Sequence, residues 1–332
     1  MKKIGGSEAD DNNDLSALVT WVNRFNRQRG STLNQAQLQQ LETLEVGGDD
    51  ELKDVPESLG NLTQLKKLSI DKCAVEVLPE SIGRLCQLET LIIKDTPLKS
   101  LPSGLFELPE LKLLIIGRTD VTTMPAEIGQ LNKLEMLDLY TSRFETLPEA
   151  LGNCRALKVL RLFCADIKEL PDSIGNLNTL ENLELELSKI EKLPESIGQL
   201  TNLRRLNLRG AKAFTGLPAS VGKLTQLEVL RLDSTAISEL PETIGQLANL
   251  RILSLEGTPL TSLPHSIVQL TQLKRLNLLK CKVTELPIEL AKNVDLQIAT
   301  KRVTTELPHL VAQADHRFFD VDLTPVTEIP LY

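Results

Sequence analysis

Evenly spaced prolines constrain this chain more than any other feature of its sequence. The spacing is 23 residues, with one step of 24 residues between Pro194 and Pro218. The series consists of Pro56, Pro79, Pro102, Pro125, Pro148, Pro171, Pro194, Pro218, Pro241, Pro264 and Pro287. A chain that repeats a short unit grows by stacking copies and not by enlarging one core. We therefore expect one repeat array over most of the 332 residues, although length alone suggests two domains of about 150 residues.

Apolar residues occupy the same places in every unit. One unit reads Leu65-x-x-Leu68-x-Ile70-x-x-Cys73-x-Val75-x-x-Leu78-Pro79-x-x-Ile82-Gly83-x-Leu85. Because side chains alternate along a strand, the two residues of each L-x-L both face the core, and the residues around them face the opposite, concave side. Proline ends strand pairing and begins the convex segment. The pattern therefore predicts one parallel strand and one short helical or 3-10 segment per unit.

This frame resembles the leucine-rich repeat family, in which the unit runs L-x-x-L-x-L-x-x-T-x-L-x-x-L-P-x-x-I-G-x-L. The resemblance covers residues 41–308 and implies an α/β leucine-rich-repeat solenoid, or horseshoe, with a parallel concave β-sheet. It is similar to Ras-group cytoplasmic proteins, plant immune-receptor domains and bacterial effector proteins. The family usually carries an asparagine whose side chain bonds neighbouring backbones in a ladder, and this asparagine is missing here. Hydroxyls at its position, the ladder slot, can still bond a turn backbone, whereas alanine cannot. The slot holds Cys73, Thr96, Thr119, Ser142, Ala165, Ser188, Ala211, Thr235, Thr258 and Cys281.

The two ends of such an array need caps, because the apolar core of the terminal repeat would otherwise be exposed to solvent at each end. Residues 1–40 predict a disordered start and a helical cap. In this cap a first helix runs from an N-cap at Asp14 to a stop at Gly30, and a second helix begins near Thr32. The apolar positions of these helices are Leu15, Leu18, Val19, Val22, Phe25, Leu33, Ala36, Leu38 and Leu41. The alternative is a partner-binding helix that uses Trp21, Arg24, Arg27 and Arg29.

The C-terminal end is irregular. Leu296 and Ile298 predict a strand, and the Leu307-Pro308 pair comes one residue late. We interpret residues 309–332 as a C-terminal cap, in which Val321 and Leu323 belong to a degenerate last strand.

Composition argues against several classes of partner. The chain has 37 Lys+Arg against 45 Asp+Glu and a net charge of −8. Phosphate backbones and anionic membranes need clustered basic residues, so we expect neither nucleic acid nor membrane as a partner. The N-terminus lacks the apolar core of a Sec signal peptide, so we expect a cytoplasmic protein, or one that a specialised bacterial system secretes into a host cell. We expect it to be monomeric when alone.

Catalytic and metal-binding patterns are missing from the sequence. It contains no GxxxxGK[ST], GxGxxG, HExxH or GxSxG motif. Five cysteines without CxxC spacing and three scattered histidines predict free thiols, no zinc and no cofactor. Cys164-Ala165-Asp166 has the Cys-x-Asp form of an effector ubiquitin ligase, but it lies inside a repeat, and Cys154 is expected to be a small packed side chain. We therefore expect no enzyme activity.

Specificity should reside in the residues around each strand leucine, which form three columns on the concave face. The first column, before the leucine pair, runs Lys67, Thr90, Leu113, Met136, Val159, Asn182, Arg205, Val229, Ile252, Arg275. The middle column, between the pair, runs Ser69, Ile92, Ile115, Asp138, Arg161, Glu184, Asn207, Arg231, Ser254, Asn277. The last column, after the pair, runs Asp71, Lys94, Gly117, Tyr140, Phe163, Glu186, Arg209, Asp233, Glu256, Leu279.

Two features of these columns define the candidate protein-binding site. Apolar residues predict one contiguous area, and exposed areas of this kind mark interfaces. Charges alternate in sign along the columns, which fits either recognition of a partner or a ladder in which the charges satisfy one another. Coverage of the area by a self-contact or by the chain's own tail is the alternative to an interface. The candidate residues are Ile92, Leu113, Ile115, Met136, Asp138, Tyr140, Val159, Arg161, Phe163, Glu184, Glu186, Arg209 and Arg231.

These observations predict a non-catalytic protein-binding module that uses the concave face. One version is a bacterial effector or adaptor that acts on a host protein, and another is a cytoplasmic signalling scaffold. The alternative is the targeting portion of an enzyme, such as a ubiquitin ligase, whose catalytic domain lies elsewhere.

Overall fold

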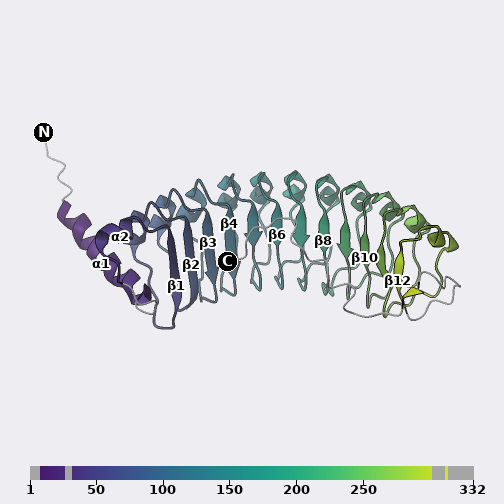
Figure 1. Ribbon diagram of the computed structural model, residues 1–332, viewed down its shortest axis with the longest axis horizontal. Coiled ribbons are helices and arrows are strands. Elements are labelled where there is room, and N and C mark those ends of the chain that lie inside the picture. The colour runs from purple at the N-terminus through teal and green to yellow at the C-terminus, as the bar shows by residue number, and fades with distance from the viewer. Residues whose placement is uncertain (1–7, 27–31, 301–310, 313–332) are drawn as a thin grey trace. The chain divides into compact units, whose positions relative to one another are not determined.

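A computed structural model describes residues 8–26, 32–300 and 311–312 of the chain. The chain forms two compact units, residues 1–143 and residues 144–332. Each unit contains parallel strands in chain order, and a 3-10 segment lies between successive strands as far as β12 (Figure 1). This is the repeat that the proline spacing predicts.

The first unit begins with two helices, α1 (Glu8–Asn26) and α2 (Gln35–Gln39). Its strands are β1 (Thr43–Asp49), β2 (Lys67–Cys73), β3 (Thr90–Lys94), β4 (Leu113–Gly117) and β5 (Met136–Asp138). The 3-10 helices between them are η2 (Glu57–Asn61), η3 (Glu80–Arg84), η4 (Ser103–Glu107) and η5 (Ala126–Gln130).

The second unit repeats the arrangement with shorter strands. They are β6 (Val159–Arg161), β7 (Asn182–Glu184), β8 (Arg205–Asn207), β9 (Val229–Arg231), β10 (Ile252–Ser254), β11 (Arg275–Asn277), β12 (Gln297–Ala299) and β13 (Val311–Ala312). The 3-10 helices are η6 (Glu149–Asn153), η7 (Asp172–Asn176), η8 (Glu195–Gln199), η9 (Ala219–Lys223), η10 (Glu242–Gln246), η11 (His265–Gln269) and η12 (Ile288–Lys292).

Rows of leucines build the core of each unit. Leu68, Leu91 and Leu114 are partners on neighbouring strands, and all three are fully buried. Each leucine contacts its equivalents one repeat away, so apolar burial comes from stacking. The register that places the three concave columns opposite this core is thereby confirmed within each unit.

Carboxylates on the convex side tie one repeat to the next. The Glu80 carboxylate accepts hydrogen bonds from the backbone N–H of Ser103 (3.3 Å) and of Gly104 (2.9 Å), at the start of η4. Glu149 and Glu242 do the same for the repeats that follow them. These bonds lower the pKa of all three carboxyls. In these repeats the glutamate after the proline therefore satisfies donors that a short helix leaves unpaired, a role that sequence analysis missed.

A left-handed residue follows the last column in repeat after repeat. Positive φ angles recur at Lys72, Asp95, Arg118, Thr141, Cys164, Leu187, Gly210, Ser234, Gly257 and Lys280. Only two of these positions are glycine, so the turn imposes the left-handed conformation on residues that avoid it, at a cost of roughly 1–2 kcal/mol each. The Cys-x-Asp pattern at Cys164 thus begins at a structural turn position that recurs along the array.

Three of the six hydroxyls in the ladder slot bond the turn backbone as expected, whereas those of Thr96, Thr119 and Ser142 are buried without a hydrogen-bond partner. Ser188, Thr235 and Thr258 are buried, and each donates to the carbonyl oxygen three residues earlier at 2.7–2.8 Å. Ala165 and Ala211 fill the slot by packing alone.

The N-terminal helices pack on the first repeat. Leu18, Val22 and Leu38 are fully buried, and Asn34 forms a capping box with Gln37 at the start of α2. Helix α1 begins at Glu8 and not after an N-cap at Asp14. Gly30 lies outside the described residues.

The side chains proposed for a partner-binding helix contact the first repeat instead. The Trp21 indole N–H donates to the carbonyl of Asp54 (3.1 Å), and the Arg24 guanidinium lies 2.5 Å from the Asp49 carboxylate. These contacts favour a cap over a partner-binding helix. Arg27 and Arg29 lie outside the described residues.

At the C-terminal end, β12 contains the strand expected around Ile298, and β13 pairs with it. The Leu307-Pro308 pair and the predicted strand at Val321 and Leu323 lie outside the described residues.

Replacing Ser234 by glycine should raise the free energy of unfolding by about 0.5–1 kcal/mol. Glycine removes the left-handed cost of roughly 1–2 kcal/mol, and part of this gain is offset by its greater freedom in the unfolded chain. Urea unfolding followed by circular dichroism measures the difference. The matched control is Ser238→Gly, an exposed serine without a positive φ, which should lower stability. Equal losses in both variants would contradict this account of the turn.

Candidate protein-binding surface

The candidate residues of the first unit lie on β3, β4 and β5 in the predicted register. Ile92 pairs with Ile115, which pairs with Asp138, and Leu113 pairs with Met136. The apolar part of this surface is less open than the sequence suggests, since Ile92, Met136 and Asp138 are buried. Side chains on adjacent strands stand about 4.8 Å apart and shield one another. The accessible part of the surface therefore rests on Leu113, Ile115 and Tyr140.

Tyr140 lies across the neighbouring repeat. A Cβ atom at Gly117, one position along the last column, would stand 2.2 Å from the Tyr140 ring, so glycine is required for this packing. The Arg118 guanidinium lies 5.8 Å from the ring centroid, within the range of a cation–π contact. Burial, followed by the charge of Asp95, raises the pKa of the Tyr140 phenol. The ring is thus partly a structural group, in addition to being a candidate for binding.

Phe163 is the exposed aromatic residue of the second unit's candidate set, with 37% of its surface accessible. Val159, at the start of the same strand, is buried and pairs with Asn182. Tyr140 and Phe163 belong to different units, so the contiguity of the apolar area across them stays a prediction.

Charged candidates of the second unit also follow the register. Arg161 pairs with Glu184 on the next strand, and Arg209 lies 3.9 Å from Glu186. Burial raises the pKa of the Glu184 carboxyl, while Asn207 and Arg161 oppose that shift. Arg231 is buried between Asn207 and Ser254 in the middle column.

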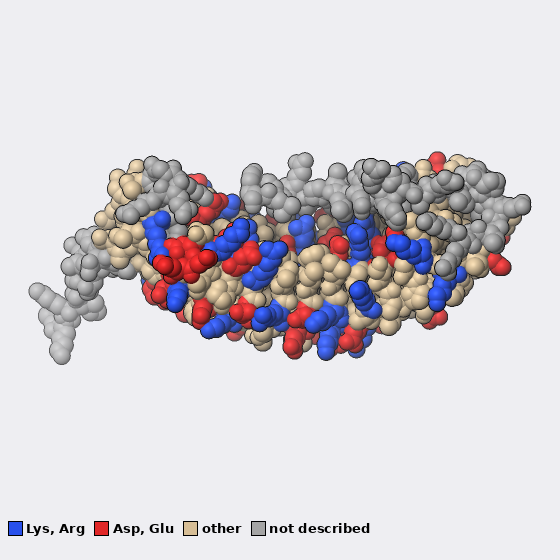
Figure 2. All heavy atoms as spheres, turned by 90° about the horizontal axis from the view of Figure 1, so that it is seen from below, with Lys and Arg blue, Asp and Glu red and all other residues tan. Residues whose placement is uncertain are grey.

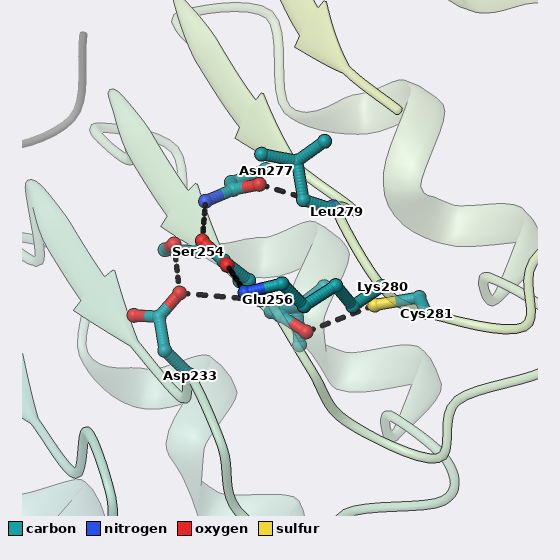
Figure 3. A network of polar contacts seen from close by, with 8 residues as sticks. Asp233, Ser254, Glu256, Asn277, Leu279, Lys280 and Cys281 are labelled. Atoms are coloured by element: carbon teal, nitrogen blue, oxygen red, sulfur yellow. Dashed lines mark hydrogen bonds and ion pairs between the residues drawn. The ribbon is translucent and has the colours of Figure 1, made fainter. Parts of the chain in front are cut away.

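A polar ladder joins the middle column to the last column of the preceding repeat (Figure 3). Asn207 donates to Glu186 (3.2 Å), Asn277 donates to Glu256 (3.3 Å), and the Ser254 hydroxyl bonds the Asp233 carboxylate. The donor lies 21 residues after the acceptor in every case. This spacing is readable in the sequence, although Asn207, Ser254 and Asn277 were not singled out there.

Backbone groups complete the ladder. The Asn277 side-chain carbonyl accepts from the N–H of Leu279 (3.0 Å), and Lys280 bonds the Glu256 carboxylate at 2.7 Å (Figure 3). The carboxylates of Glu186, Asp233 and Glu256 thus each accept a hydrogen bond from a side chain of the next repeat, which is compatible with the alternative in which the charges satisfy one another.

Other charges pair between repeats at the 23-residue spacing. In the face seen in Figure 2, basic and acidic side chains lie beside one another. Exposed pairs of this kind each contribute under about 1 kcal/mol. Examples are Lys94–Asp71, Lys112–Glu89, Arg118–Asp95, Lys189–Asp166 and Lys192–Glu169.

Burial raises the pKa of four of the five cysteine thiols, those of Cys73, Cys154, Cys164 and Cys281. All five are free thiols, and Cys154 is fully buried, as expected for a small packed side chain. Burial raises the pKa of Cys154 to about 12 and also raises that of Cys164, whereas a reactive cysteine needs a lowered pKa. Within the described residues there is no cluster of potential metal ligands, and no helix has the length and apolar character needed to cross a bilayer.

The Asp233 carboxylate of the polar ladder should destabilise the folded state as the pH rises. Burial raises its pKa in the folded state despite bonds from Ser254 and Glu256, so its contribution is most favourable below the unfolded pKa of about 3.9 and is lost as the pH rises through the folded pKa. Asp233→Asn keeps an acceptor oxygen and removes the charge. The variant should gain stability relative to the wild type between about pH 4 and pH 7, measured by urea unfolding.

At Glu242 we expect the opposite dependence of stability on pH. Backbone bonds lower its pKa, so its contribution is present above the unfolded pKa and is lost as the pH falls. Glu242→Gln should therefore lose stability relative to the wild type as the pH rises. The same trend in both variants would refute the assigned causes.

A family model described as a leucine-rich repeat region matches residues 32–164, 148–233 and 219–311. No curated protein matches the chain. The chain is similar to the plant peptide hormone receptor RGFR1 in complex with RGF2, with 24% identity, a TM-score of 0.59, and coverage of 79% of this chain and 48% of that chain.

Two further structures share the fold. An internalin (inlF) of Listeria monocytogenes has 17% identity and a TM-score of 0.60, with 86% of this chain and 90% of that chain covered. The Drosophila Toll–Spatzle complex has 21% identity and a TM-score of 0.67, with 80% and 37% covered. This chain thus spans about half of the plant receptor chain. Because the matched segments together run from residue 32 to residue 311, the chain belongs to the leucine-rich repeat family.

Proposed function

We propose that this protein is a non-catalytic protein-binding module that uses the concave face of its repeats. The observation that carries the proposal is Phe163, an exposed aromatic side chain on a sheet face whose neighbouring charges are fixed by the polar ladder. Aromatic residues on rigid elements bury much area at low entropic cost and dominate binding hot spots.

The similar structures support this class of function. The plant receptor is described in complex with RGF2 and the Drosophila protein in complex with Spatzle. Complexes on related folds show that leucine-rich repeats serve as binding modules, and we extend that role to this chain.

We also propose a more specific class of protein and a place where it acts. We favour a bacterial effector or adaptor that acts on a host protein, or a cytoplasmic signalling scaffold, because Thr and Cys in the ladder slot resemble the effector-type and plant-type repeats. The net charge of −8 supports a protein partner over nucleic acid or an anionic membrane. We expect the free chain to be monomeric.

Affinity capture with the full chain tests the proposal. Phe163→Ala should leave the melting temperature within about 2 °C and weaken capture of a specific partner about 30-fold, as expected for a hot-spot loss of about 2 kcal/mol. Tyr140→Ala should weaken capture as well, but it also removes the ring packed on Gly117 and should lower the melting temperature.

Lys223→Ala is the matched control, because this exposed residue lies on the convex helix η9. Glu195 is less suitable, since its carboxylate accepts from the Ser220 N–H of the next repeat at 3.1 Å. Wild-type capture by Phe163→Ala, or loss of capture in Lys223→Ala, would place the binding surface elsewhere.

A further inference from the structure

A basic pocket lies where strands β8–β11 begin, away from the candidate residues described above. Its volume is about 250 Å³. The first-column residues Arg205, Val229, Ile252 and Arg275 cross it in this order, and the register pairs each with the next. The row therefore reads basic, apolar, apolar, basic across adjacent strands.

The pocket is strongly positive in its composition. Arg205, Arg251, Lys274 and Arg275 line it together with a single carboxylate, that of Glu228. The Glu228 carboxylate accepts a hydrogen bond from Arg204 at 2.8 Å and also lies 4.0 Å from Arg251. A guanidinium outside the pocket lining thus already compensates the acidic group, within a chain whose net charge is −8.

This composition is not a general property of hollows on the repeats. A second pocket in the same unit, of about 370 Å³, is lined by Glu149, Glu169, Asp172 and a single lysine, Lys192. The basic pocket therefore reflects particular side chains in successive repeats. Guanidinium groups present paired N–H donors that match carboxylates.

The spacing between strands indicates how far apart the carboxylates of a ligand should be. Three steps of about 4.8 Å place the start of the Arg205 strand and the start of the Arg275 strand about 14 Å apart. In an extended peptide, residues i, i+2 and i+4 point the same way, and i and i+4 are about 13 Å apart. Carboxylates at i and i+4 can thus reach the two arginines, while an apolar residue at i+2 lies over Val229 and Ile252.

We propose that this pocket binds an extended acidic segment of a partner protein, with carboxylates four residues apart on either side of an apolar residue. The inference rests on the proposed protein-binding function and assigns its partner a chemistry. Affinity should fall as salt rises, because charge pairing carries the recognition.

Fluorescence anisotropy with labelled peptides and the full chain tests this. The probe contains the core Asp-Ser-Leu-Ser-Asp between Gly-Ser flanks, and its controls carry Asn-Ser-Leu-Ser-Asn or the shortened core Asp-Leu-Asp. The first peptide should bind at least about 10-fold more tightly than the amide peptide and about 5-fold more tightly than the shortened one, since each lost carboxylate–arginine contact is a charge-assisted bond.

Arg205→Gln/Arg275→Gln should weaken binding of the probe about 10-fold or more. The matched control, Lys212→Gln/Lys223→Gln, removes the same charge from exposed positions outside the pocket and should leave binding unchanged. Equal affinity for the charged and amide peptides, no dependence on spacing, or wild-type binding by the arginine variant would overturn the proposal. If these tests fail while Phe163→Ala still weakens partner capture, only the assignment of the pocket is wrong and the proposed function stands.

The chain's own segment 313–332 is the alternative occupant, because it contains Asp315, Asp320, Asp322 and Glu328. Asp320→Asn/Asp322→Asn/Glu328→Gln in the full chain should leave the affinity of the probe unchanged. A rise of about 10-fold or more would show that this segment competes for the arginines, and would overturn the partner protein as the occupant.

Discussion

Burial between neighbouring repeats is the interaction on which the rest of this structure depends. A 23-residue unit has no layer of its own to cover its leucines, so Leu91 is buried only because Leu68 and Leu114 lie in register on either side. The same constraint explains the first helices, since Leu18, Val22 and Leu38 are buried where the array begins. Stability is therefore a property of the stack, and each repeat depends on its neighbours.

Hydrogen bonds on both the convex and the concave side also connect one repeat to the next. Glutamates on the convex side bond the backbone of the next 3-10 helix, and the concave polar ladder bonds one column to the next. A left-handed residue also recurs at the same turn position in successive repeats. These links fix the concave side chains before any partner arrives, and a rigid surface loses little conformational entropy on binding. The contacts that hold the repeats together therefore also preorganise the concave surface for binding.

Periodicity made the fold predictable, while side-chain detail limited prediction of the site. The proline spacing and the L-x-L frame predict strands, 3-10 segments and column register, because all three depend on which residues face the core. Burial of Ile92 and Met136 and the packing of Tyr140 on Gly117 depend on neighbours 23 residues away and were not foreseen. The left-handed positions were also missed, because residues such as Leu187 and Lys72 carry no glycine signal. The glutamates that follow some of the prolines, such as Glu80, Glu149 and Glu242, can be read in the sequence, but their role becomes clear only when two repeats are stacked.

The central claim is that partner recognition belongs to the concave face and that the convex face is structural. Hydroxyl-radical footprinting of the free chain and of its captured complex measures side-chain accessibility on both faces at once. Phe163, 37% exposed in the concave column, and Ile288, 67% exposed on the convex helix η12, are both labelled by this chemistry. The account predicts that labelling of Phe163 falls several-fold in the complex while labelling of Ile288 stays unchanged. Protection of Ile288 with Phe163 still fully labelled would contradict it.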